Sequence, residues 1–116
     1  MAINIETLKE FLGSDEEFIA TLMDKFIQEM PREEARMKAF ASQRDWKGVR
    51  AVAHKMLSST KIFGLYELTS VLQDVERFAE SQTNLELMPD LLSKFENSCK
   101  SIVEEMKLQR EKLQKK

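Results

Sequence analysis

The fold is decided by the stretch of residues 49–63, VRAVAHKMLSSTKIF, in which mostly apolar side chains recur every three or four positions. This spacing places them on one face of a helix with about 3.6 residues per turn. Asp45 can cap the start of this helix, and Gly64 can end it or mark a sharp junction. The face predicted to be buried consists of Val49, Val52, Ala53, Met56, Thr60 and Phe63.

The sequence before this stretch predicts a short helix and then a long one. Residues 5–12 carry apolar side chains at helical spacing, and Gly13 can end that helix. The run Ser14-Asp-Glu-Glu17 has the pattern of a capping box at a new helix start. Pro31 is expected to kink or divide the long helix, because proline donates no backbone hydrogen bond. The predicted core stripe of the long helix is Phe18, Ile19, Leu22, Met23, Phe26, Ile27 and Met30, and helix resumes through Met37, Phe40 and Ala41.

Two further helices are predicted after Gly64. The polar run at residues 81–84 has the composition of a loop between them, and Pro89 suits the first turn of the second. The buried positions are expected to be Leu65, Leu68, Leu72, Val75 and Phe78 in the first, and Leu92, Phe95, Cys99, Ile102 and Met106 in the second.

These patterns predict an all-α protein. A chain of 116 residues is long enough for one core, so residues 1–116 are expected to form a single domain. The alternating pattern of strands is absent, and no internal repeat or interdomain linker is visible. The expected architecture is an up-and-down four-helix bundle with a short extra N-terminal helix.

Composition narrows the classes of function. The net charge is −2 with both signs mixed, so no basic stripe indicates a nucleic-acid partner, and the basic C-terminal residues suit a helix end. The single cysteine, Cys99, cannot form an internal disulfide and is expected to be a buried apolar filler. No signal peptide or run of 18 uncharged apolar residues is present, so we expect a cytoplasmic protein without membrane insertion.

The only histidine, His54, is predicted to face solvent. On the helical wheel it projects roughly 150° from the centre of the apolar face of residues 49–63. Neutral imidazole has a nucleophilic nitrogen and needs no special activation near pH 7. There is no phosphate-cradling glycine loop and no second histidine for a dimetal site, so the chain is not expected to energise His54 alone. Near His54 the wheel places the cations Lys47, Arg50 and Lys61 and the small residues Ala51 and Ser58.

The segment 53–64, AHKMLSSTKIFG, followed by Leu68, Leu72 and Glu76, resembles the histidine-containing phosphotransfer (HPt) family of two-component phosphorelays. The Asp45-Trp46 pair and the Phe-rich helix ending in Met30-Pro31-Arg32 are also similar to that family. The resemblance implies a four-helix bundle on which His54 accepts a phosphoryl group from the aspartyl phosphate of a receiver domain and passes it to another receiver.

The resemblance also implies which proteins are the partners and which of them supplies the metal ion. The expected partners are response-regulator receiver domains and a hybrid sensor kinase, and the receiver is expected to bring Mg²⁺, with no cofactor or metal on this chain. The chain would then be a phosphocarrier rather than an enzyme, contributing position and charge complementarity.

The sequence departs from the family pattern just after the histidine. The family commonly has Lys three positions and Gly four positions after it, where this chain has Leu57 and Ser58, whereas Gly64 matches. Lys55 or Lys61 can replace the missing cation, and Leu57 is either an apolar docking contact or an edge-of-core residue.

Two other readings stay open at this point. The departures at Leu57 and Ser58 leave room for a scaffold or binding module of the same fold that has lost phosphotransfer. A hydrolytic or metal enzyme has no support beyond scattered carboxylates. Nothing in the residues identifies the direction of transfer, or whether the chain is free-standing or a domain of a larger sensor kinase.

Overall fold

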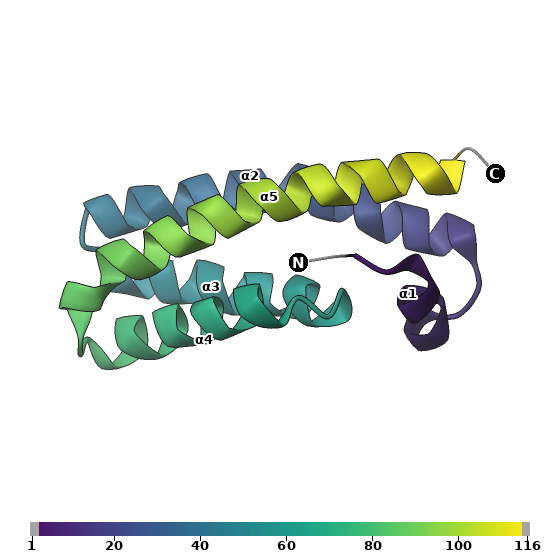
Figure 1. Cartoon of the computed structure of the whole chain (residues 1–116). Helices are drawn as coiled ribbons and strands as arrows, with labels where there is room; N and C mark the ends of the chain where they lie inside the picture. Colours follow the sequence, from purple (N-terminus) through teal and green to yellow (C-terminus); the bar gives the residue numbers. More distant parts are fainter. Residues whose placement is uncertain (1–2, 115–116) are drawn as a thin grey trace.

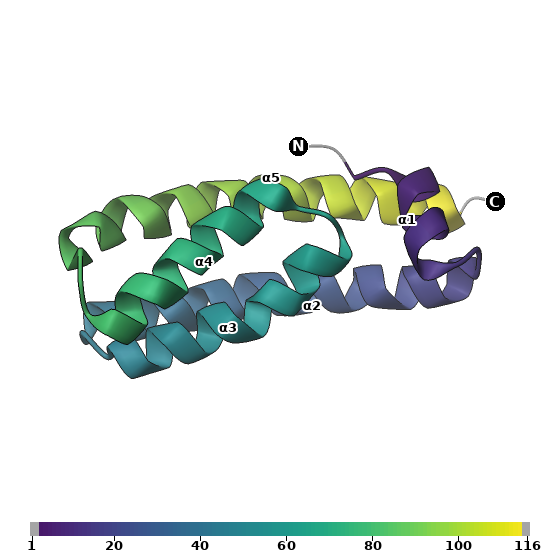
Figure 2. The same ribbon diagram turned by 90° about the horizontal axis from the view of Figure 1, so that it is seen from below.

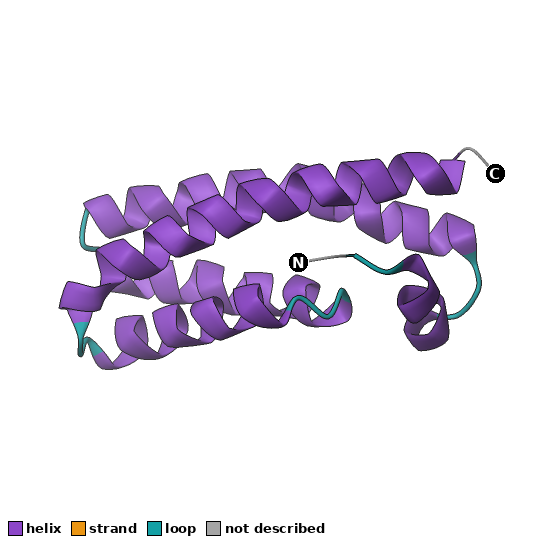
Figure 3. Cartoon of the chain, viewed as in Figure 1, coloured by secondary structure: helices purple, strands orange, loops and turns teal. Residues whose placement is uncertain are grey.

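The computed structural model describes residues 3–114, and within them the secondary structure is helical (Figure 3). The prediction of an all-α fold with a short N-terminal helix is therefore confirmed. The elements are α1 (Ile5–Leu12), α2 (Glu16–Ser42), α3 (Trp46–Ile62), α4 (Tyr66–Ser81), the 3-10 turn η1 (Leu85–Leu87) and α5 (Met88–Gln114).

Helices α2 to α5 form an antiparallel bundle in which each packs against two others. The packed pairs are α2 with α3, α3 with α4, α4 with α5, and α5 with α2. Because α2 and α5 have 27 residues each, they extend beyond α3 and α4, which have 17 and 16. Helix α1 lies beside this extension and contacts α2 (Figures 1 and 2). No helix in residues 3–114 is long and apolar enough to cross a bilayer.

Several helix ends were predicted correctly from residues close to them in the sequence. Asp45 caps α3, because its carboxylate accepts a hydrogen bond from the Gly48 N–H at 3.0 Å. Gly13 and Gly64 follow the ends of α1 and α3 with φ of +93° and +66°, a conformation that favours glycine. Both predicted helix ends are confirmed.

The predicted capping box at the start of α2 is wrong. Helix α2 begins at Glu16, one residue later than a cap at Ser14 requires, so Asp15 is the N-cap. The Asp15 carboxylate accepts from the Phe18 N–H at 3.1 Å. Asp is as good a cap as Ser, and here the negative charge also suits the positive end of the helix dipole.

Pro31 does not divide the long helix, contrary to one predicted outcome. Helix α2 runs through Pro31, whose ring lies on the exposed face. Met30 and Met37 are buried on either side of it, so packing along the whole helix offsets the missing hydrogen bond.

The core follows the predicted stripes with a few differences. In α3, Val49, Val52, Ala53, Met56 and Thr60 are all buried as predicted. Phe18 is wrongly predicted as core: it is 48% exposed, because it lies in the first turn of α2, beyond the ends of α3 and α4. Phe78 and Leu92 are half-buried. Cys99 is buried as predicted, and this burial, together with the Glu34 carboxylate, raises the pKa of its thiol to about 12.

Gly48 allows α2 and α3 to pack closely at the end of the bundle. A Cβ atom at this position would lie 2.6 Å from the Phe40 ring. We therefore expect Gly48→Ala to lower the free energy of unfolding by about 1–3 kcal/mol, the usual cost of overpacking. Denaturant unfolding measures this, with Lys47→Ala as the exposed neighbouring control. Equal stability of the two variants would contradict the close packing.

Candidate functional site

His54 lies on the outer face of α3, midway along the helix. Its side chain is 69% exposed, whereas its neighbour Ala53 is fully buried. The helical wheel correctly predicted this orientation. The buried face of α3 fixes the rotation of the helix, and that rotation turns position 54 away from the core.

The imidazole of His54 is held by a carboxylate from the neighbouring helix. Its Nδ1 lies 2.6 Å from Oε2 of Glu76 on α4, and the Glu76 side chain is only 20% exposed. In the neutral imidazole, one ring nitrogen carries the proton and the other has a free lone pair. A carboxylate beside Nδ1 selects the tautomer with the proton on Nδ1, which leaves Nε2 unprotonated and nucleophilic.

Glu76 is a site residue whose role was not predicted from the sequence. It was part of the family-like pattern, but no contact with His54 was predicted. The contact depends on the register between α3 and α4, which run antiparallel and pack closely. One turn along both helices, Arg50 Nε lies 3.6 Å from Oε1 of Glu80, in the same register. The presence of Glu76 in the family-like pattern was a signal that could have pointed to it, but its contact with His54 requires knowledge of the register between α3 and α4.

The predicted cations divide into two groups. Arg50 lies one turn before His54, while Lys47 and Lys61 are exposed on the same side of α3 at about 20° from it on the wheel. Lys55 instead binds Glu33 of α2, with its Nζ 3.0 Å from Oε1. Arg50, Lys47 and Lys61 therefore lie on the same side of α3 as His54, whereas Lys55 is directed toward α2.

Glu33 is an almost buried carboxylate that joins α2 to α3. It is 5% exposed and also accepts from Arg36 at 2.8 Å. Burial alone would raise the pKa of Glu33, but the hydrogen bond from Lys55 and the charge of Arg36 outweigh burial and hold this pKa below its usual value.

This lowered pKa predicts a pH-dependent contribution to stability. A group with a depressed folded-state pKa stabilises the fold above its unfolded pKa of about 4.5, and that contribution is lost as pH falls through the folded value. We expect wild type to exceed Glu33→Gln by about 1 kcal/mol in free energy of unfolding at neutral pH, because Lys55 and Arg36 are half-exposed. Urea unfolding measured from about pH 7 down to about pH 3 should show this difference in free energy closing in acid. A gap that stayed constant would contradict this role.

Leu57 is not on the outer face of α3, so the prediction that it is an apolar docking contact is wrong. It is 6% exposed and belongs to the core, which is the alternative that the sequence left open. A rotation of about 60° from His54 is enough to pass from the exposed face of α3 to the packed one. Ala51 and Ser58 are exposed beside His54, and Gly64 lies in the turn after α3.

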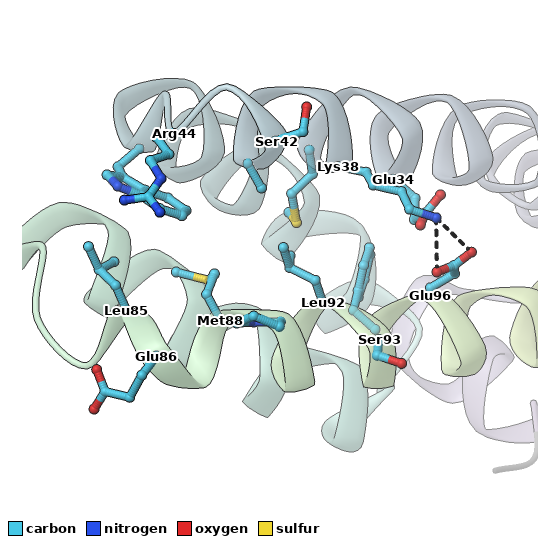
Figure 4. Close-up of a pocket in the computed structure, with 15 residues that line it drawn as sticks. Glu34, Lys38, Ser42, Arg44, Leu85, Glu86, Met88, Leu92, Ser93 and Glu96 are labelled. Carbon is cyan, nitrogen blue, oxygen red and sulfur yellow. Dashed lines mark hydrogen bonds and ion pairs between the residues drawn. The ribbon is translucent and has the colours of Figure 1, made fainter.

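A hollow with a mostly apolar lining lies elsewhere. It is a groove of about 640 Å³ between α2 and α5, lined by Met37, Trp46 and Leu92, with a Lys38–Glu96 ion pair at one end (Figure 4). Neither His54 nor Glu76 lines it. The candidate site is therefore an exposed side chain on a convex helix surface, which suits a macromolecular partner better than an enclosed small substrate.

Comparisons with known proteins agree with this arrangement. In overall structure the chain is similar to the crystal structure of histidine-containing phosphotransfer protein B (HptB) from Pseudomonas aeruginosa PAO1, with a TM-score of 0.84 over 95% of each chain and 18% identity. At this identity the likeness shows the fold. The comparison with curated proteins gave no match. The Hpt domain family model matches residues 21–113, which include all the residues around His54. The chain therefore belongs to the Hpt domain family, whose members act as histidine phosphocarriers in two-component phosphorelays.

Proposed function

We propose that His54 is the phosphoryl-accepting residue of this chain and that its Nε2 is the reacting atom. The observation that carries this proposal is an exposed imidazole whose other nitrogen, Nδ1, is held 2.6 Å from Glu76. This contact orients the ring and keeps the proton away from Nε2. The donor is the aspartyl phosphate of a receiver domain, and a second receiver is the acceptor.

The transfer needs little chemistry from the carrier itself. The Nε2 lone pair forms a bond to phosphorus while the bond from phosphorus to the receiver's aspartate oxygen breaks, and the aspartate leaves as a carboxylate. The proton on Nδ1 stays in place, so positive charge develops on the imidazole beside the Glu76 carboxylate. Charge neutralisation on the phosphoryl oxygens by Mg²⁺ is assigned to the receiver.

Arg50 is the best-placed cation for the phosphoryl group. It lies one helical turn before His54, and its contact with Glu80 at 3.6 Å is loose enough to be exchanged. Lys47 and Lys61 extend positive charge along the same side of α3, and the small side chains of Ala51 and Ser58 leave room for a partner. Together these residues take the place of the lysine that the family commonly has at the position of Leu57.

The partners follow from the same site. Receiver domains of response regulators are the proposed docking partners, with a hybrid sensor kinase as the upstream donor of the phosphoryl group. The site of transfer is proposed to be the cytoplasm, where receiver domains and kinases meet.

The decisive experiment is direct phosphoryl transfer. Incubation of the chain with a phosphorylated cognate receiver should label the chain with a phosphoryl group that is stable in alkali and labile in acid, as expected for phosphohistidine. Receivers that bind the chain without any exchange of label would overturn the proposal and favour a scaffold of the same fold.

A further inference from the structure

The strongest unassigned surface feature is a hollow rimmed by exposed aromatic side chains. The hollow, of about 270 Å³, lies between α1 and the turn that joins α3 to α4. Tyr66 and Phe11 rim it and are 84% and 72% exposed, the two highest values among the large hydrophobic residues that the structure describes. We call this feature the aromatic hollow; it is lined by Asn4, Thr7, Leu8, Phe11, Lys61, Ile62, Phe63, Gly64 and Tyr66.

Two exposed aromatic side chains beside a hollow are a feature typical of protein interfaces. Large aromatic side chains dominate the energetics of protein interfaces, and they serve as anchors when they surround a small pocket. At about 270 Å³ the aromatic hollow has room for an apolar side chain of a partner protein.

The aromatic hollow is continuous with the surface around His54. Lys61 lines the hollow and lies seven residues after His54, about 20° around the helix and about 10 Å along it. A partner that covers about 800 Å² has a footprint on the order of 30 Å across, so a receiver seated over His54 also reaches the hollow.

We infer that the aromatic hollow is a second docking point for the receiver, which inserts an apolar side chain between Phe11 and Tyr66. This inference rests on the proposed function of His54. Within residues 3–114 Lys61 forms no ion pair, so an acidic residue beside the inserted side chain completes the match.

The aromatic hollow gives the chain a means to select among receivers. Phe11 and the rest of α1 lie outside residues 21–113, the part that the Hpt family model matches. A receiver that lacks the apolar side chain can still bind over His54, but its affinity is not increased by contacts with α1. Differences in affinity between receivers then arise at the hollow, away from the reacting atoms.

The test compares transfer from a protein donor with transfer from a small one. Phosphorylated receiver and phosphoramidate are each used to label wild type and the double variant Phe11→Ala/Tyr66→Ala. With the receiver, we expect kcat/KM of the double variant to fall about tenfold or more, mainly through a higher KM. With phosphoramidate, labelling of His54 should be unchanged, because the chemistry does not involve the hollow.

Matched controls separate docking from folding and from the proposed function. Leu87→Ala removes an apolar side chain that is 45% exposed in η1, at the far end of the bundle, and should leave both reactions unchanged. Thermal unfolding shows whether the double variant keeps its fold. Receiver kinetics unaffected in a folded double variant, or a change only in its oligomeric state, would overturn the inference while leaving His54 as the acceptor. Failure of both donors to label wild type would overturn the proposed function itself.

Discussion

Replacement of His54 by glutamine is expected to abolish phosphoryl acceptance completely, from a phosphorylated receiver and from phosphoramidate alike. His54 is the only histidine in the chain, so no other imidazole can take over the reaction. Glutamine has a similar reach and can still donate a hydrogen bond to Glu76, but its amide has no nucleophilic lone pair that matches Nε2. The measurement is incorporation of acid-labile label under conditions in which wild type is fully labelled.

The same variant separates chemistry from docking. Because the His54 side chain is 69% exposed, we expect the free energy of unfolding to change by less than about 0.5 kcal/mol. Binding of an unphosphorylated receiver should also persist, since the surrounding surface is intact. Labelling that persisted in His54→Gln would show that another residue accepts the phosphoryl group, and the proposed site would then be wrong.

The fold was predictable because its main signals are local. The apolar face of residues 49–63 is regular enough to fix the rotation of α3, and so the exposure of His54 followed from the wheel without knowledge of any other helix. Asp45 and Gly64 mark the ends of α3 with side-chain and backbone chemistry that acts within a few residues. Signals that act between residues close together in the chain can be recognised in a single sequence.

The errors arise where distant packing decides between local alternatives. Continuity of α2 through Pro31 depends on the buried contacts of Met30 and Met37 with other helices. Phe18 carries the right periodicity for a core residue, but α3 and α4 are too short to cover it. Leu57 lies at the boundary of two faces, where a few tens of degrees separate a docking residue from a core residue.

The site itself was predictable only in part, for the same reason. Position 54 and its cationic neighbours on α3 follow from one helix. The partners of these residues come from other helices: Glu76 of α4 contacts His54, and Glu33 of α2 binds Lys55. Periodicity places a residue on a face of its own helix, but it does not give the register between helices.

Replacement of Glu76 is expected to have the second large effect on the rate of transfer. Glu76 acts on the imidazole of His54 without contacting the phosphoryl group. Positive charge develops on the imidazole during transfer, and a carboxylate at 2.6 Å from Nδ1 stabilises that charge more than it stabilises the neutral ring. Hydrogen bonds to charged groups contribute about 1.5–3 kcal/mol, against about 1 kcal/mol for neutral pairs. We therefore expect Glu76→Gln, which keeps the bond but loses the charge, to slow transfer about tenfold, and Glu76→Ala to slow it about a hundredfold.

The kinetic pattern distinguishes this positioning role from docking. Changes at Glu76 should lower the maximal rate with little change in KM, and they should slow labelling by phosphoramidate as much as labelling by a receiver. Glu80→Gln is the matched control, because Glu80 lies one turn away on α4 and pairs with Arg50 instead of His54. If Glu76→Gln and Glu80→Gln had equal effects, or if Glu76→Gln raised only the KM for the receiver, the carboxylate would be part of the docking surface and the tautomer of His54 would be set by other means.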